Sequence, residues 1–177
     1  MTDRQNEILV LALGNDIMGD DAAGLFAARA LKDSFGGKID IFEVASAGFG
    51  LIDILEGYKK VLILDSVPSR HEGPGHIMEL TKDNFSNHIS WSPHYAGLPE
   101  LISLAEKLEI NFPDDIRVLV LEITEKGIIR EGLSPEIEKQ IPLYVDIASS
   151  LLNEWICGKV AVYSEHAHHL MYKDLIY

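Results

Sequence analysis

Hydrophobic and polar positions along the chain fall into short apolar runs separated by longer amphipathic stretches. Apolar runs bounded by turn residues predict buried strands, and a stretch that alternates between apolar and polar residues predicts an edge strand. The predicted strands cover residues 8–13, 39–44, 61–64, 76–81 and 116–121. The first of them, ILVLAL, is apolar throughout, which is typical of a strand buried on both faces of a sheet.

Between these strands, apolar residues recur at the spacing of amphipathic helices. The predicted helices begin at Ala22, where Leu25, Phe26, Arg29 and Ala30 follow at helical spacing, and otherwise cover 51–57, 97–108 and 134–155. Ser134 and Pro135 have the chemistry of an N-cap and a first helical residue, and Pro142 should interrupt the helix that they begin. Strands alternating with helices predict an α/β fold with three layers, in which helices cover both faces of a mostly parallel, twisted sheet.

Two adjacent acids, Asp20 and Asp21, stand where the turn after the first strand becomes a helix. One interpretation is that they cap the helix by accepting hydrogen bonds from its free amide groups. The other is that one carboxylate faces the carboxyl edge of the sheet, where open α/β sheets bind their ligands. The turn has neither the glycine spacing of a dinucleotide-binding site nor the Lys-Ser/Thr of a P-loop.

Three chemically active residues far apart in the sequence are predicted to meet at that edge. Asp21 follows the first predicted strand, Asp65 ends the third, and His94 precedes the helix at 97–108. Two carboxylates and one imidazole suit a divalent first-row metal such as nickel or zinc, and three protein ligands leave coordination positions open. Taken singly, Asp65 could close an Asx turn and His94 could be a surface residue.

Composition narrows the class of protein. The chain has 177 residues, of which 47% are hydrophobic, and we expect a single domain over 1–177 with a C-terminal tail at 158–177. A formal net charge of −13 argues against nucleic acid and anionic membranes as partners. The N-terminus has no signal-peptide pattern and no apolar run approaches the roughly 20 residues that span a bilayer, so we expect a cytoplasmic protein.

Two further features concern cysteine and histidine. Cys157 is the single cysteine, which excludes an internal disulfide, and we expect it to be a small buried hydrophobe near a helix end. The tail contains His166, His168 and His169, which could bind a metal or could be solvated.

Several segments together resemble the nickel–iron hydrogenase maturation endopeptidases. They are LALGNDIMGDDAAG (11–24), ASAG (45–48), VLILDSV (61–67), SPHYAGL (92–98) and GLSPEI (132–137). The resemblance implies an endopeptidase that removes a short C-terminal extension from a hydrogenase large-subunit precursor after nickel insertion. It also implies that Asp21, Asp65 and His94 are the catalytic and metal-contacting residues. Nickel would arrive with the substrate, zinc or cadmium could replace it in a crystal, and we expect a monomer.

The chain also departs from the family pattern. Ala12 stands where the family usually has glycine, residues 43–46 replace a D-G-G-T type of loop, and EITEKG retains only Gly127 of a proline and a glycine. Two other functions therefore stay open. One is a non-proteolytic binding module or chaperone for the large subunit. The other is a nucleoside-type hydrolase with an aromatic pocket, to which Phe49, Trp91 and Tyr95 could contribute.

Overall fold

The computed structural model describes residues 6–45, 50–69, 73–81, 98–124 and 129–158. Within these ranges, five strands form one sheet in the order β2-β1-β3-β5-β4. The strands are β1 (Ile8–Leu13), β2 (Asp40–Val44), β3 (Lys60–Pro68), β4 (Ile77–Thr81) and β5 (Asp115–Ile123). Neighbouring strands are parallel except for β4, which pairs antiparallel with β5 at one edge. The predicted mostly parallel sheet and its edge strand are therefore confirmed.

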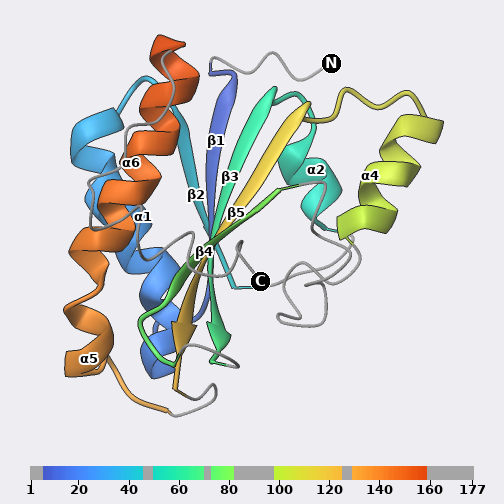
Figure 1. The fold of residues 1–177 in the computed structure, drawn as a ribbon. Coiled ribbons are helices and arrows are strands. Elements are labelled where there is room, and N and C mark those ends of the chain that lie inside the picture. The colour runs from blue at the N-terminus through green and yellow to red at the C-terminus, as the bar shows by residue number, and fades with distance from the viewer. Residues whose placement is uncertain (1–5, 46–49, 70–72, 82–97, 125–128, 159–177) are drawn as a thin grey trace, which may run out of the picture.

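Helices cover both faces of this sheet, as the sequence predicts (Figure 1). They are the 3₁₀-helix η1 (Gly19–Ala22), α1 (Ala23–Phe35), α2 (Leu51–Leu55), α4 (Leu98–Lys107), α5 (Pro135–Glu138) and α6 (Ile141–Cys157). In Figure 1, α1, α5 and α6 lie on one side of the sheet, and α2 and α4 lie on the other. Since β3 and β5 run downward in that view, the carboxyl edge of the sheet is at the bottom, next to the start of α1.

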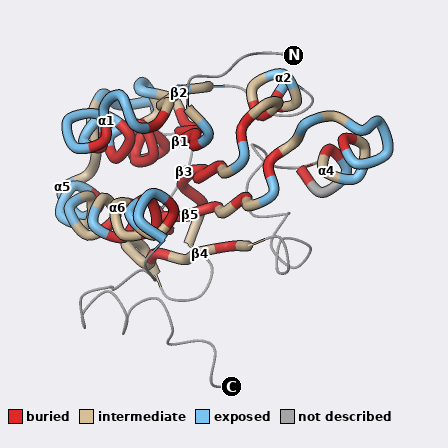
Figure 2. Tube along the Cα trace, turned by 90° about the horizontal axis from the view of Figure 1, so that it is seen from above, coloured by how far each residue is buried: buried red, intermediate tan, exposed pale blue. Residues whose placement is uncertain are grey.

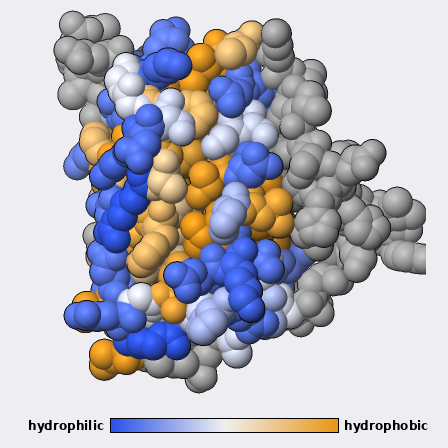
Figure 3. Space-filling model, turned by 90° about the vertical axis from the view of Figure 1, so that its left-hand side faces the viewer, coloured by the Kyte–Doolittle hydropathy of each residue, from blue (hydrophilic) through white to orange (hydrophobic). Residues whose placement is uncertain are grey.

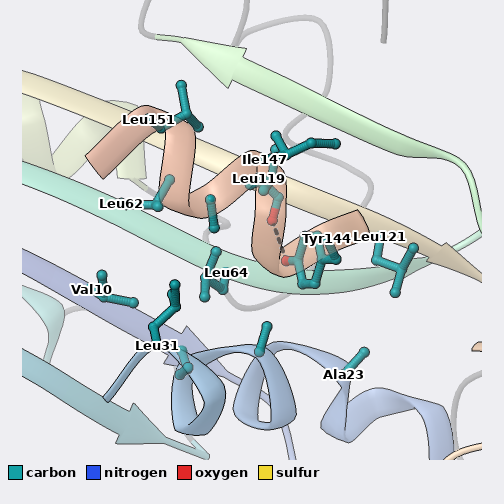
Figure 4. Close-up of a cluster of buried hydrophobic side chains, with 14 of the residues drawn as sticks. Val10, Ala23, Leu31, Leu62, Leu64, Leu119, Leu121, Tyr144, Ile147 and Leu151 are labelled. Carbon is teal, nitrogen blue, oxygen red and sulfur yellow. Dashed lines mark hydrogen bonds between the residues drawn. The ribbon is translucent and has the colours of Figure 1, made fainter. Parts of the chain in front are cut away.

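The sheet separates two hydrophobic cores. In Figure 2 the central strands are mostly red, and buried residues also occur in the helices on both sides of them. Val10, Leu62 and Leu64 face α1 and α6, whereas Leu9, Leu11 and Ile63 belong to the core under α2 and α4. All six residues of β1 are buried, because alternate side chains enter opposite cores. Figure 4 shows the first core, where side chains of α1 and α6 meet those of the central strands.

The helix α1 forms where predicted, and the residues named for their helical spacing divide between its buried and exposed sides. Leu25 and Leu31 are buried against the sheet, whereas Phe26 is 38% exposed and Arg29 and Ala30 are also exposed. Small alanines on the sheet side bring the helix close to the strands and leave the larger Phe26 outside. Figure 3 looks onto this side of the molecule and shows hydrophobic residues along its middle, bordered by hydrophilic ones.

The predicted helix over 134–155 is divided in two, as Pro142 requires. Ser134 caps α5, since its hydroxyl accepts a hydrogen bond from the amide of Ile137 at 3.3 Å. The break precedes Pro142, which lies in the first turn of α6, where a missing amide hydrogen is tolerated. The prediction for Cys157 is wrong. This residue is the last of α6 and is exposed, because Trp155 takes the position that faces the sheet.

Among the described helices, none is long and apolar enough to cross a membrane. The tail histidines His166, His168 and His169 lie outside the described residues.

Candidate active site

Two glycines allow the turn after β1 and the start of α1 to pack closely against the carboxyl edge of the sheet. Gly14 has a φ of +148°, and a Cβ atom there would lie 2.2 Å from the carbonyl oxygen of Asp21. A Cβ atom on Gly24 would lie 2.6 Å from the carbonyl oxygen of Leu64. Only glycine permits approaches this close. Since Gly24 comes three residues after Asp21 and Leu64 precedes Asp65, the two close approaches place Asp21 near the end of β1 and near the part of β3 that carries Asp65.

The two adjacent acids, both buried, have different partners. The carboxylate of Asp20 accepts hydrogen bonds from the amide of Ser134 at 2.6 Å, from its hydroxyl at 2.9 Å, and from Nη2 of Arg130 at 3.1 Å. Asp20 therefore holds η1 to the segment that begins α5. Main-chain bonds reinforce this connection, because Gly19 donates to Arg130 and Arg130 donates to Ile17.

The capping interpretation of Asp20 and Asp21 is wrong. The N-cap residues of η1 and α1 are Met18 and Ala22, and neither helix has a side-chain cap. Both acids instead lie in the first turn of η1, where a negative charge favours the helix dipole. Asp20 is bound by a segment more than a hundred residues away in the sequence, and Asp21 follows it in η1, after the end of β1.

Asp65 lies inside β3, whereas the sequence predicts it at the end of the strand. The strand continues to Pro68 because β5 pairs with it in register, with Asp65 opposite Val120 and Pro68 opposite Ile123. This extended pairing also excludes the Asx turn. Asp65 is fully buried, and its Oδ1 accepts a hydrogen bond from the amide of Ser66 at 2.7 Å.

The orientation of Asp65 follows from the alternation of side chains along β3. Ile63 and Val67 belong to the core under α2 and α4, so Asp65 points to the same face of the sheet. His94 lies outside the described residues. The helix α4, which begins four residues after His94, packs on this face, because Leu98 and Leu101 are buried in the same core.

The helix α6 supports the strand that carries Asp65 from the opposite face of the sheet. The hydroxyl of Tyr144 donates a hydrogen bond to the carbonyl oxygen of Leu119 at 2.7 Å (Figure 4) and lies 3.1 Å from the carbonyl oxygen of Asp65. Tyr144 is fully buried. It therefore fixes the backbones of β3 and β5 to each other where the candidate site begins.

A network of charges ties the turn after β1 to α1 and β2. The guanidinium of Arg29 bonds both carboxylate oxygens of Asp16 at 2.7 Å and Oε2 of Glu43 at 2.6 Å. Lys32 bonds Glu43 at 3.2 Å. Hydrogen bonding to Arg29 lowers the pKa of both carboxyl groups and raises the pKa of the guanidinium. Glu43, a departure from the family pattern, is thus part of the framework of the site.

Sequence reasoning missed one buried acid at this edge. The predicted strand over 116–121 stops before Glu122, whereas Glu122 lies in β5 and is 1% exposed. A charge at the end of an apolar run resembles a strand end, and only the pairing with β3 shows that the strand continues. Within the described residues, no group of three or more His, Cys, Asp or Glu side chains is placed to hold a metal ion. Phe49, Trp91 and Tyr95 lie outside those residues.

Comparisons with known proteins place this chain in a family. Residues 26–151 match the sequence model described as hydrogenase maturation protease. The hydrogenase 2 maturation protease of Escherichia coli is 30% identical over 136 residues, which cover 73% of this chain and 77% of that protein. A putative hydrogenase maturation protease of Methanocaldococcus jannaschii is 26% identical over 153 residues, covering 81% of this chain and 95% of the relative.

Solved structures agree with the sequence comparisons. The hydrogenase maturating endopeptidase HybD from E. coli superimposes with a TM-score of 0.73 at 25% identity, covering 84% of this chain and 93% of that structure. The [NiFe] hydrogenase maturation protease HybD from Thermococcus kodakarensis gives a TM-score of 0.66 at 28% identity, with coverages of 82% and 98%. The chain therefore belongs to the hydrogenase maturation protease family and is a hydrolase of the endopeptidase class.

Proposed function

We propose that this protein removes the C-terminal extension of a nickel–iron hydrogenase large-subunit precursor after nickel has been inserted. In this proposal Asp21, Asp65 and His94 contact the nickel that the precursor carries. The observation that carries the proposal is the position of two buried acids from separate segments at one edge of the sheet, beside the helix that follows His94. The names of the relatives supply the class of client.

The chemistry of these side chains suits a nickel ion that belongs to the substrate. Carboxylate and imidazole are both ligands for divalent first-row metals, and three ligands leave positions for groups of the client. A metal ion at a scissile bond can polarise the carbonyl or activate a water molecule. Cleavage would then report that the client has received its metal. We further propose that the protein acts as a monomer in the cytoplasm.

The rigid surroundings of the acids support recognition of one defined geometry. Asp21 sits on η1, which Gly14, Gly24 and the bonds of Asp20 hold against the sheet. Asp65 sits in a central strand with paired neighbours on both sides. Side chains supplied by such elements keep their positions before the client arrives, so that little ordering is needed on binding.

The proposal is tested by mixing the protein with nickel-loaded and nickel-free precursor and comparing the masses of the products. We expect a shortened large subunit and a released peptide from the nickel-loaded precursor alone. Intact masses in both mixtures, with a stable complex of the two proteins, would instead identify a non-proteolytic chaperone. Equal cleavage of both precursors would exclude nickel as the recognised feature.

A further inference from the structure

Glu122 is a buried acid that the proposed function leaves without a task. It lies in β5 between Leu121 and Ile123, both fully buried, and is itself 1% exposed. Burying a carboxylate is unfavourable unless other groups compensate for the lost hydration. Glutamate is one of the side chains that serve as general bases in enzymes, so its place beside the candidate active site bears on the chemistry.

The register of the sheet places Glu122 on the same face as Asp65. Glu122 is paired with Val67, and Asp65 is paired with Val120 on the same two parallel strands. Because side chains alternate along a strand, Asp65 and Val67 share a face, and their paired residues share it too. Strand spacing and rise put the Cα atoms of Asp65 and Glu122 about 8 Å apart. The two carboxylates therefore project from the same face of the sheet, on neighbouring strands.

Local contacts hold the Glu122 carboxylate at the end of the strand. The hydroxyl of Ser69 donates a hydrogen bond to its Oε2 at 3.3 Å. The main chain of Glu122 is also paired: its amide donates to the carbonyl oxygen of His76 at 2.8 Å, and its carbonyl oxygen accepts from the amide of Gly75 at 2.7 Å.

This pattern is that of a β-bulge, in which Gly75 and His76, just before β4, face the single residue Glu122 of β5. Gly75 has a φ of +92°, as such a bulge requires. Bulges of this kind are frequent beside active sites, where they redirect a strand and end its regular pairing. Here the bulge ends the pairing of the edge strand at Glu122, on the carboxyl side of the sheet.

We propose that Glu122 is the general base of the cleavage, an inference that rests on the proposed function. The oxygen of a water molecule attacks the scissile carbonyl carbon while Glu122 takes one of its protons. The carbon–nitrogen bond then breaks, and the leaving nitrogen takes that proton from Glu122. The products are a carboxylic acid and an amine, and Glu122 is a carboxylate again.

The test compares Glu122→Gln and Glu122→Asp with the unmodified protein on nickel-loaded precursor. Glutamine keeps the size of the side chain and an oxygen that can accept the Ser69 hydrogen bond, but it cannot take a proton. We expect a cleavage rate lowered at least 100-fold, with binding of the precursor within about twofold of normal. Glu122→Asp keeps a carboxylate and should retain more activity than Glu122→Gln. Glu106→Gln, the same change at an exposed position of α4, is the control and should cleave normally.

The possible outcomes distinguish a failure of this inference from a failure of the proposed function. If the unmodified protein cleaves and Glu122→Gln cleaves equally fast, Glu122 is not the base. If Glu122→Gln loses activity together with its melting temperature and its binding of precursor, the role is structural and the inference is wrong. If the unmodified protein itself does not cleave, the proposed function fails first.

Discussion

The carbonyl oxygen of Asp21 lies directly over Gly14, at 2.2 Å from where a Cβ atom of that residue would be. No side chain fits there without moving the backbone of η1, and the φ of +148° is itself strained for other residues. The geometry of one proposed metal-contacting residue therefore depends on a glycine seven residues earlier in the chain.

We expect Gly14→Ala to displace Asp21, to lower the cleavage rate at least tenfold and to cost about 2 kcal/mol of unfolding free energy. Gly37→Ala is the matched control, because Gly37 also has a positive φ of +81° but has no atom within 4 Å of the added Cβ. Chemical denaturation and a processing assay measure the two effects. A Gly14→Ala protein with normal processing would show that the position of Asp21 is unimportant.

Asp20 and Asp21 should respond differently to the same substitution. Asp20→Asn weakens three hydrogen bonds to Ser134 and Arg130, and we expect it to lower the free energy of unfolding by about 2 kcal/mol. Asp21→Asn keeps the size of the side chain but removes its charge, and we expect it to abolish processing of nickel-loaded precursor while the protein stays folded. Denaturation curves and product masses for both variants test this division, and the reverse pattern would contradict it.

Tyr144 offers a test of how the core supports the site. Tyr144→Phe removes the hydroxyl bonded to Leu119 and near Asp65, and leaves two buried carbonyl oxygens with one partner fewer. We expect a loss of about 1–2 kcal/mol in unfolding free energy and a smaller decrease in processing rate. Hydrogen exchange of the β3 and β5 amides should increase in the same variant. Unchanged stability would mean that the hydroxyl does not hold these strands.

The charge network at Arg29 should make part of the stability depend on pH. The pKa values of Asp16 and Glu43 are lowered from 3.8 and 4.5 by hydrogen bonds from Arg29, so their contribution is complete above those values. It is lost as the pH falls through the lowered values, when both carboxylates take up protons. Since these side chains are partly exposed, we expect less than about 1 kcal/mol in all.

The measurement is the difference in unfolding free energy between the unmodified protein and Arg29→Met across a pH series. We expect the difference to be constant near neutral pH and to shrink below a pH of about 4.5. High salt should reduce it as well. A difference that stays the same in acid and in salt would mean that Arg29 acts by packing on Phe26, whose ring centroid is 5.9 Å away.

Local patterns predicted the central elements well. The predicted and observed bounds of β1 agree because every residue of ILVLAL is buried. The predicted break near Pro142 is observed because proline ends a helix by a local effect, the loss of an amide hydrogen and the bulk of its ring. The positions of Asp65 and Glu122 within strands depend on the mutual register of β3 and β5, which no local pattern contains. The partner of Asp20 likewise cannot be predicted from a local pattern, since Ser134 is 114 residues away in the sequence.

The central claim is that Asp21, Asp65 and His94 can together coordinate one metal ion. The most direct measurement is the anomalous scattering of crystals of the protein soaked with cadmium, which can stand in for nickel. We expect a single strong peak at the carboxyl edge of the sheet, within ligand distance of both carboxylates and the imidazole. A peak that contacts only one of the three, or cadmium bound elsewhere with this edge empty, would contradict the account.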